Sequence, residues 1–207
     1  MVGSAATLLI ATSNPGKFRE LASLMSGSLF SLVSLSDVGI ETDVPETGST
    51  LEENAALKAA IYARLSGMLT LADDSGLEVE ALGGEPGHLS ARFAGEGATD
   101  AQLIAYLLQR LNNIPENEWS ARFRCVLAVA GPEKPVELYG GECRGRIVSK
   151  SRGVNGFGYD PVFFLPEFGR TMAELSSAEK NRVSHRSRAA VKAVAALNRP
   201  AATRGNA

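Results

Sequence analysis

Short apolar runs alternate with amphipathic segments in the first half of the chain. The runs 7–12 (TLLIAT), 30–35 and 68–74 (MLTLADD) predict three strands, the last of them ending in two acids. Between the first two runs, apolar residues recur at helical spacing and give one buried stripe. These residues are Phe18, Leu21, Leu24 and Met25. Alternation of strands and helices favours an α/β fold.

Polar residues mark where the predicted helices begin and end. Asn14 is a preferred N-cap, and Pro15 then occupies the first helical position, where its missing N–H costs nothing. Thr50 and Glu53 have the spacing of a capping box, and Gly67 is placed to end the helix that follows. Two helices are therefore expected, one after each of the polar stretches 11–14 and 41–49.

The second half of the chain predicts a hairpin between two helices. Thr99 and Gln102 have capping-box spacing before a helix, and Ser184 is placed to cap the last one. The apolar segments 119–130 and 135–148 are expected to pair as a hairpin that turns at GPEK. A hairpin added to alternating strands and helices predicts a mixed central sheet. We expect a single domain over residues 1–199 and a disordered tail over residues 200–207.

Composition narrows the classes of function. The chain has 207 residues, 44% of them hydrophobic, and a formal net charge of -2, which gives no general attraction for nucleic acid or an anionic membrane. No segment approaches the roughly 18 apolar residues of a membrane span. The two cysteines, Cys125 and Cys143, have no metal-ligand or redox spacing and are expected to be reduced thiols of a cytoplasmic protein. With two histidines, a metal would be bound by oxygen ligands.

The stretch ATSNPGK places a cation where a helix disfavours one. Lys17 falls in the first helical turn, and the amino end of a helix already carries about half a positive charge. A phosphate between Lys17 and the free N–H groups of the turn resolves this conflict, with Thr12, Ser13 and Asn14 as further donors. The alternative is a lysine that bends into solvent.

Paired acids follow the third predicted strand. Neighbouring side chains of a strand point to opposite faces, so Asp73 and Asp74 are not expected to enter the same cleft. One of them is a candidate for metal binding or acid–base chemistry, although Asp-Ser-Gly is also typical of a turn. Glu46 is a candidate second carboxylate, or else an exposed loop acid. Lys58, on a half-apolar helix face, either meets an anion or extends to solvent.

Two further stretches are candidates for ligand binding, one by an aromatic ring and an acid, the other by a cluster of basic residues. In GVNGFGYDPVFF, Phe157 lies between two glycines and precedes Asp160, an arrangement that suits a stacked nucleobase whose ring N–H is accepted by the carboxylate. A glycine-rich turn with core aromatics is the alternative. In EKNRVSHRSRAA, basic or donor residues crowd the start of the last helix, which favours a polyanionic ligand over a solvated charge cluster. They are Lys180, Arg182, Ser184, His185, Arg186 and Arg188.

Five segments together resemble the inosine triphosphate pyrophosphatase family, whose members hydrolyse deaminated purine nucleoside triphosphates to monophosphate and pyrophosphate. In chain order they are TSNPGK, ETGSTLEENAALKA, ADDSGLEVEALGGEPGHLSARFAG, GFGYDPVF and AELSSAEKNRVSHRSRA. The resemblance implies an elongated α/β domain with a mixed central sheet and two lobes that enclose the active site. It also implies a homodimer, dependence on Mg²⁺, and a purine nucleoside triphosphate as substrate.

The resemblance assigns roles position by position. Asp74 would be the catalytic carboxylate and a metal ligand, Glu46 the second metal ligand, and Lys58 a catalytic group that supports the phosphates or the attacking water. Substrate-binding residues would hold the triphosphate near the first helix and the base near the glycine-rich stretch. They are Thr12, Ser13, Asn14, Pro15, Gly16, Lys17, Ser75, Phe157, Gly158, Tyr159, Asp160, Lys180, His185 and Arg186.

Two other classes of protein remain as alternatives. A regulator that binds a purine nucleotide without chemistry would need the phosphate and base sites but neither Asp74 nor Glu46, so these acids count against it. A pyrophosphatase of the related septum-inhibitor type would begin with a Ser-x-Ser-Pro-x-Arg-like turn, which the NPGK sequence disfavours.

Overall fold

A seven-stranded mixed sheet forms the centre of the computed structural model, which describes residues 6–199. The expected tail at residues 200–207 lies outside the described residues. The strand order is β2-β1-β3-β4-β5-β6-β7, with β2, β1 and β3 parallel and the later neighbours antiparallel. The strands are β1 (Thr7–Ala11), β2 (Ser31–Ser34), β3 (Leu69–Val79), β4 (Ser120–Gly131), β5 (Lys134–Ile147), β6 (Phe163–Leu165) and β7 (Arg170–Thr171). The expected α/β fold with a mixed sheet and a β4–β5 hairpin is confirmed.

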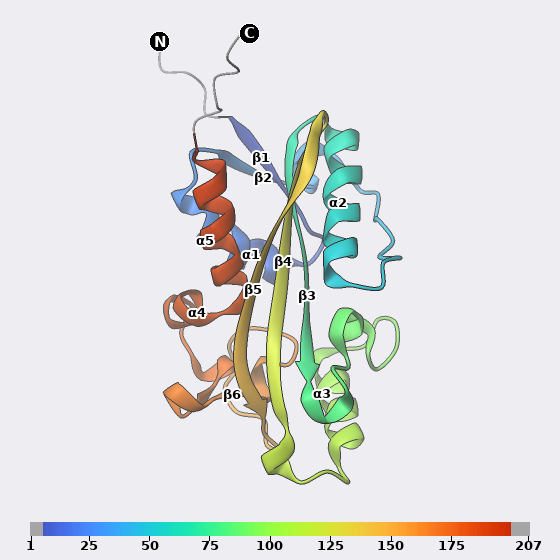
Figure 1. Ribbon diagram of the computed structural model, residues 1–207, viewed down its shortest axis with the longest axis vertical. Helices are drawn as coiled ribbons and strands as arrows, with labels where there is room; N and C mark the ends of the chain where they lie inside the picture. The colour runs from blue at the N-terminus through green and yellow to red at the C-terminus, as the bar shows by residue number, and fades with distance from the viewer. Residues whose placement is uncertain (1–5, 200–207) are drawn as a thin grey trace, which may run out of the picture.

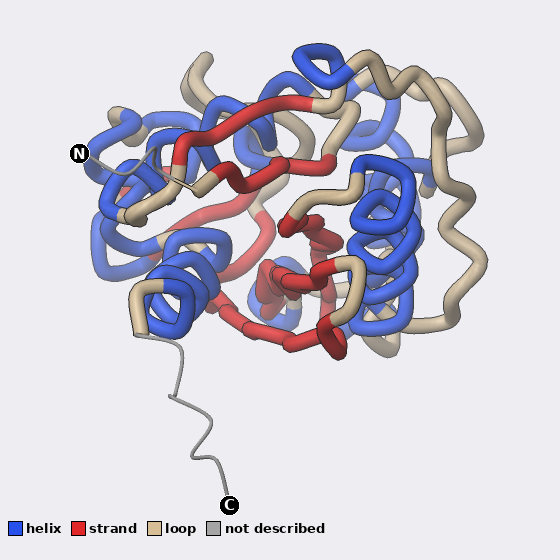
Figure 2. The backbone as a smooth tube through the Cα atoms, turned by 90° about the horizontal axis from the view of Figure 1, so that it is seen from above, coloured by secondary structure: helices blue, strands red, loops and turns tan. Residues whose placement is uncertain are grey.

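Helices cover both faces of the sheet, as the view from above shows (Figure 2). They are α1 (Pro15–Leu24), α2 (Leu51–Ser66), α3 (Asp100–Leu111), α4 (Ser177–Val183) and α5 (His185–Leu197). Alternation along β1 explains this layering: Leu9 packs in one core cluster with residues of α2, whereas Leu8 packs in another with residues of α1 and α5. No helix among residues 6–199 is long and apolar enough to cross a bilayer.

The long strands β3, β4 and β5 run along the longest axis of the molecule (Figure 1). Their far ends carry a third core cluster, in which Leu77, Phe123 and Phe163 pack with Leu103 and Leu107 of α3. The sheet therefore joins the two clusters around β1 to a separate cluster beside α3.

The observed helix starts follow the polar signals in the sequence. Asn14 caps α1 by accepting from Lys17 N, with Pro15 at the first position. At α3, Thr99 and Gln102 form the complete capping box. At α2 the predicted box is half formed: Thr50 accepts from Glu53 N, but the Glu53 carboxylate turns to Ser49 N at 2.7 Å. Glu53 thus stabilises the preceding loop as well as the helix.

The two acids lie in the middle of β3, so the prediction that the strand ends with them is wrong. Pairing with β4 continues from Asp73 opposite Leu127 to Val79 opposite Ala121. β1 stops opposite Ala72, which opens the neighbouring edge of β3 from Asp73 onward. The 3-10 turn η4 (Gly87–Arg92) packs against this stretch so closely that a Cβ on Gly76 would lie 2.0 Å from the Gly87 carbonyl oxygen. Glycine at position 76 is required for this contact.

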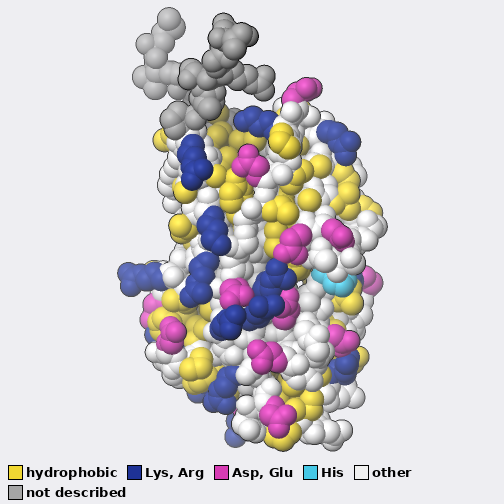
Figure 3. All heavy atoms as spheres, viewed as in Figure 1, with side chains coloured by type: hydrophobic (Ala, Val, Ile, Leu, Met, Phe, Trp, Pro, Cys, Tyr) yellow, Lys and Arg dark blue, Asp and Glu magenta, His cyan; other side chains and the backbone are white. Residues whose placement is uncertain are grey.

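Charged side chains on the sheet surface are largely paired with one another. Arg122 contacts Glu78 at 2.7 Å and Glu142 at 3.2 Å, and Arg124 contacts Glu52 at 2.6 Å. On the face shown in Figure 3, Lys and Arg side chains lie among Asp and Glu side chains. The basic residues on this face therefore do not build a single cationic surface.

Candidate active site

A cleft of about 240 Å³ opens beside β3, beyond the end of β1. We call it the central cleft. It is lined by twelve of the residues singled out in the sequence: Asn14, Lys17, Glu46, Asp74, Ser75, Phe157, Gly158, Tyr159, Asp160, Lys180, His185 and Arg186. Other residues singled out in the sequence lie outside its lining, among them Thr12, Ser13, Pro15, Gly16, Lys58 and Asp73. Residues far apart in the chain thus meet at one cavity, with β3 at its centre.

Asp73 faces the cations of α1 and α5. Its Oδ2 lies 3.1 Å from Lys17 Nζ and 3.7 Å from Arg186, and its side chain is buried. Burial by itself raises the pKa of Asp73, but Lys17, Arg186 and Lys58 outweigh it and hold that pKa well below its usual value. The anion of the protein itself that lies beside Lys17 is therefore the Asp73 carboxylate, and a phosphate at this position stays a prediction.

Asp74 faces the opposite side of β3, as strand alternation predicts. Its Oδ1 lies 3.8 Å from Lys58 Nζ and accepts from Ser75 N at 2.9 Å, while its buried Oδ2 has no hydrogen-bond partner among residues 6–199. Burial raises the pKa of Asp74, and Lys58 and Lys17 offset part of that rise. Asp74 is thus the carboxylate with an oxygen still available to a ligand or a proton.

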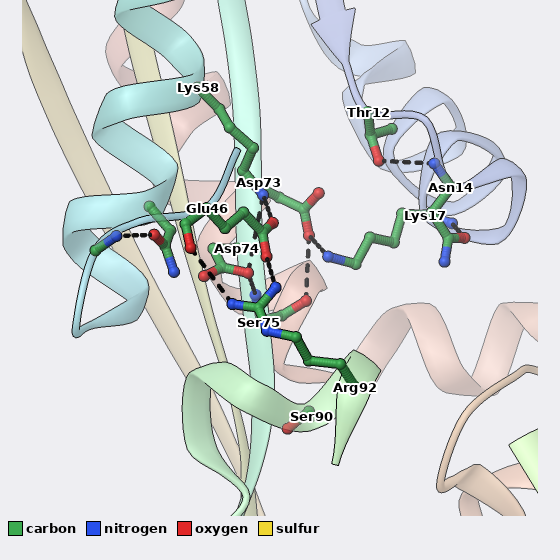
Figure 4. A network of polar contacts seen from close by, with 12 residues as sticks. Thr12, Asn14, Lys17, Glu46, Lys58, Asp73, Asp74, Ser75, Ser90 and Arg92 are labelled. Atoms are coloured by element: carbon green, nitrogen blue, oxygen red, sulfur yellow. Dashed lines mark hydrogen bonds and ion pairs between the residues drawn. The ribbon is translucent and has the colours of Figure 1, made fainter. Parts of the chain in front are cut away.

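Lys58 links Asp74 to Glu46 (Figure 4). Its Nζ lies 2.5 Å from Glu46 Oε1, and Arg92 Nη1 lies 3.4 Å from Oε2 of the same carboxylate. Burial raises the pKa of Glu46, but Lys58, Lys17 and Arg92 hold it below its usual value. Burial lowers the pKa of Lys58, but the three acids Asp73, Asp74 and Glu46 raise it above its usual value. Glu46 is therefore a paired group and Lys58 is charged.

The donor set suits a cation that takes part of its ligands from a substrate. No group of three or more His, Cys, Asp or Glu side chains within residues 6–199 could hold a metal ion alone. Mg²⁺ is usually bound by one or two carboxylates together with water and substrate phosphates. Asp74 Oδ2, which has no hydrogen-bond partner among residues 6–199, supplies one such oxygen. The carboxylate of Glu46 is close by, because Lys58 Nζ contacts both acids. These residues fit Mg²⁺ once a phosphate completes the set.

Phe157 lines the central cleft and lies against the first turn of α1. A Cβ on Gly16 would lie 2.8 Å from the Phe157 ring, so glycine is needed at that position. Lys180 Nζ and the Arg186 guanidinium lie 5.0 and 5.6 Å from the ring centroid. Asp160 accepts from Phe157 N at 3.0 Å and from Lys180, which shapes the loop that carries the ring. An aromatic surface is thereby held at a fixed position beside two cations.

Glu20 of α1 is a residue that sequence reasoning missed. It contacts Lys180 at 2.7 Å and forms an ion pair with Arg186, whose Nη2 also donates to Ser75 Oγ at 2.8 Å. The crowded cations of the last two helices therefore have carboxylate partners within the protein. Glu20 follows Lys17 by three residues, which places both side chains on one face of α1. This spacing was the signal in the sequence that could have identified Glu20.

Three further residues of this region had no clear signal in the sequence. Asp100 accepts from Gly158 N at 2.7 Å, and the carbonyl oxygen of Ser90 accepts from the Tyr159 hydroxyl at 2.9 Å. Arg92 contacts Glu46 from η4. Each of these contacts depends on segments brought together by the fold, so local pattern could not reveal them.

His185 is not a cation in the folded protein. It is buried and stacks on Phe123 with ring centroids 4.8 Å apart. Burial, with Arg186 and Lys180 close by, moves its pKa well below the usual value. Of the basic residues that crowd the start of the last helix, His185 is therefore a neutral ring, whereas Arg186 beside it carries a charge.

The buried neutral His185 predicts a pH dependence of stability. Below its ordinary pKa of about 6.5, the unfolded chain takes up a proton that the native protein does not, so stability falls as pH falls. Between pH 6 and 5, the free energy of unfolding of the wild type should fall by about 1.4 kcal/mol per pH unit more than that of His185→Phe. Urea unfolding at a series of pH values measures both slopes.

The phenylalanine variant is the matched control, because it keeps a flat ring on Phe123 and removes the titrating group. Above pH 7.5 the two curves should run parallel, since His185 is then neutral in both states. Equal slopes of the two proteins below pH 6 would show that His185 is protonated in the native state.

Comparison with known proteins gives the family. The model of the Ham1 family matches residues 8–196, so the chain belongs to the Ham1 family. A protein of Geobacillus kaustophilus (strain HTA426) named dITP/XTP pyrophosphatase is 51% identical over 185 residues, covering 89% of this chain and 91% of the relative. A Geobacter sulfurreducens protein of the same name is 48% identical over 182 residues, covering 88% of this chain and 92% of its own.

Solved structures agree with this assignment. The Ham1 protein of Staphylococcus aureus matches with a TM-score of 0.82 and 40% identity, over 92% of this chain and 97% of that one. A HAM1 protein from Coxiella burnetii matches with a TM-score of 0.85 and 38% identity, over 93% and 98% of the two chains. The resemblance read from the five sequence segments is confirmed.

Proposed function

We propose that this protein hydrolyses deaminated purine nucleoside triphosphates (ITP, dITP and XTP) to the nucleoside monophosphate and pyrophosphate, and so cleanses the nucleotide pool. It is an enzyme, a nucleoside triphosphate pyrophosphatase, like the relatives named dITP/XTP pyrophosphatase. The observation that carries the proposal is the central cleft itself. Its lining includes an aromatic ring, Phe157, and a carboxylate, Asp74, whose Oδ2 has no hydrogen-bond partner among residues 6–199. A non-catalytic nucleotide-binding regulator would not need that carboxylate.

Lys17, Lys58 and the turn before α1 bind the phosphates in this proposal. Lys17 lines the central cleft, and Lys58 contacts two of the acids that line it, Glu46 and Asp74. Both side chains are held by carboxylates, Asp73 and Asp74, so they are already oriented before a substrate arrives. A fixed cation stabilises charge that develops on the leaving pyrophosphate without reorganisation of solvent. Thr12, Ser13 and Asn14 before α1, together with Pro15 and Gly16 in its first turn, would surround the triphosphate.

Asp74 acts on the attacking water. Hydrolysis breaks the bond between the α-phosphorus and the bridging oxygen, and the water that attacks phosphorus must lose a proton. A buried carboxylate with a raised pKa is a suitable acceptor for that proton, because its basicity lies closer to neutral pH. Lys58, beside Oδ1, offsets part of the rise in the pKa of Asp74 and so favours its ionised form.

Asp74 and Glu46 would hold the Mg²⁺ that the family resemblance implies. A bound Mg²⁺ would neutralise charge on the phosphate oxygens and fix their position. The role of Glu46 is to present its carboxylate beside Asp74, and Lys58 contacts both of them.

The base lies against Phe157 in this proposal, with Gly158, Tyr159 and Asp160 forming the rest of the pocket. Inosine and xanthosine share a 6-keto group, which accepts a hydrogen bond, whereas the 6-amino group of adenine donates one. Lys180 or Arg186 would donate to the keto oxygen, and adenine would leave that donor unmatched, at a cost of about 1–3 kcal/mol. His185 supports this wall as a neutral packed ring.

Three wider proposals come from the family resemblance. The core cluster beside α3 and the two clusters around β1 would be the two lobes, with the central cleft between them. The protein would act as a homodimer. It would be found in the cytoplasm.

Pyrophosphate release from a panel of nucleotides tests the proposed function. With Mg²⁺ present, kcat/KM for dITP, ITP and XTP should exceed that for dATP by about 10- to 100-fold, as one unmatched donor implies. Removal of divalent cations with EDTA should abolish release, and added Mg²⁺ should restore it. Saturable nucleotide binding without pyrophosphate release would favour the regulator, and an equal rate with dATP would remove the proposed selectivity.

A further inference from the structure

Arg92 joins two segments that lie 46 residues apart in the chain. It is the last residue of η4, and its partner Glu46 lies in the loop before α2. Nη1 of Arg92 is 3.4 Å from Glu46 Oε2, and Nη2 is 3.4 Å from the Glu46 carbonyl oxygen. One planar guanidinium therefore contacts both the side chain and the backbone of Glu46, which a point charge could not do.

Glu46 lies between two cations that approach from different elements (Figure 4). Lys58 extends from α2 to Oε1, and Arg92 extends from η4 to Oε2. Each carboxylate oxygen has its own partner, so the rotation of the carboxylate is fixed as well as its place. Loss of Arg92 would leave Glu46 with Lys58 alone, and the carboxylate would be free to turn about that contact.

The turn that carries Arg92 is firmly anchored. Ser90 Oγ accepts from Leu77 N at 2.8 Å and donates to the Gly87 carbonyl at 2.6 Å, so η4 is bound to β3. The Ser90 carbonyl accepts from the Tyr159 hydroxyl at 2.9 Å, so the same turn is bound to the segment that carries Phe157. Arg92 thus reaches Glu46 from a turn whose position is set by β3 and by the segment that carries Phe157.

We propose that Arg92 is a positioning residue, which holds Glu46 in place for the reaction and ties the Glu46 loop to η4. The proposal rests on the proposed function, in which Glu46 and Asp74 would hold Mg²⁺. Arg92 is not among the residues that line the central cleft, and it acts through Glu46.

A double-mutant cycle on turnover tests this role. Arg92→Gln should lower kcat/KM for dITP by about 10-fold in the wild-type background, mainly through kcat, and by less than about 2-fold in the Glu46→Gln background. Arg92→Lys keeps the charge without the planar fork and should recover part of the loss. Arg144→Gln is the matched control, because it breaks another arginine–glutamate pair, to Glu142 at 3.0 Å, outside the central cleft.

Amide hydrogen exchange of the metal-free protein gives a readout that does not depend on activity. The N–H groups of Gly48 and Ser49 donate to Asn54 and Glu53, each at 2.7 Å, so their exchange reports the order of the Glu46 loop. Exchange of both amides should be several-fold faster in Arg92→Gln and in Glu46→Gln, and unchanged in Arg144→Gln.

Two results would overturn the proposal while leaving the proposed function intact. One is an Arg92→Gln protein with wild-type turnover and wild-type exchange. The other is an equal loss of turnover in both backgrounds, because Arg92 would then act independently of Glu46. If the wild type released no pyrophosphate from dITP, the proposed function would fail, and unchanged exchange in Arg92→Gln would still reject the positioning role.

Discussion

Asp74→Asn is expected to lower kcat/KM for dITP by about 10²- to 10⁴-fold, which is the usual contribution of a positioned base. Asparagine has the shape of aspartate and keeps an oxygen that can accept from Ser75 N, as Asp74 Oδ1 does at 2.9 Å. It cannot take a proton from water and carries no charge for a metal ion. The rate of pyrophosphate release and the dissociation constant for dITP, measured side by side, separate turnover from binding.

Folding should survive this substitution. Burial raises the pKa of Asp74, which means that the site disfavours the charged carboxylate, so a neutral amide should not lower the free energy of unfolding at neutral pH. The matched control is Asp43→Asn, which makes the same substitution at an exposed carboxylate outside the central cleft. Turnover of Asp74→Asn near the wild-type rate would show that another group activates the water.

Asp73→Asn is expected to act on stability instead, and to lower the free energy of unfolding at pH 7 by about 3–5 kcal/mol, as loss of one partner from a buried ion pair does. Asp73 is buried between Lys17 and Arg186, and the side chain of Arg186 is only 2% exposed. The amide would leave these cations with less compensating charge. Urea unfolding of wild type and variant at pH 7 measures the difference.

A second variant shows whether the loss comes from the unpaired cation. Lys17→Met together with Asp73→Asn removes both charges of the 3.1 Å pair and should recover part of the lost stability. If Asp73→Asn were as stable as the wild type but as inactive as Asp74→Asn, the division of roles between the two acids would be wrong.

Local signals in the sequence located most helices, because capping chemistry is set by neighbours in the chain. Asn14 with Pro15, Thr99 with Gln102, and Ser184 each mark a helix start that the structure contains. The length of β3 could not be read in this way. Asp-Ser-Gly is typical of a turn, but here it remains extended because β4 pairs with ten consecutive residues of β3 that include it. The short strands β6 and β7 and the helix α4 also went unpredicted.

Candidate site residues were easier to find than their partners. Lys17 and Arg186 stood out because a cation at the start of a helix is unfavourable, and both lie at the central cleft. Their compensating acids, Asp73 and Glu20, are contributed by β3 and α1, so only the fold shows the pairing. The neutral state of His185 likewise depends on burial, which the sequence around it does not reveal.

A crystal structure of Asp74→Asn with dITP and Mg²⁺ tests the central claim most directly, because this variant should bind the nucleotide and turn it over slowly. The account predicts phosphate oxygens within hydrogen-bond distance of Lys17 and the hypoxanthine ring against Phe157, with the metal between the phosphates and Glu46. A nucleotide bound elsewhere on the protein, with the central cleft unchanged, would contradict it.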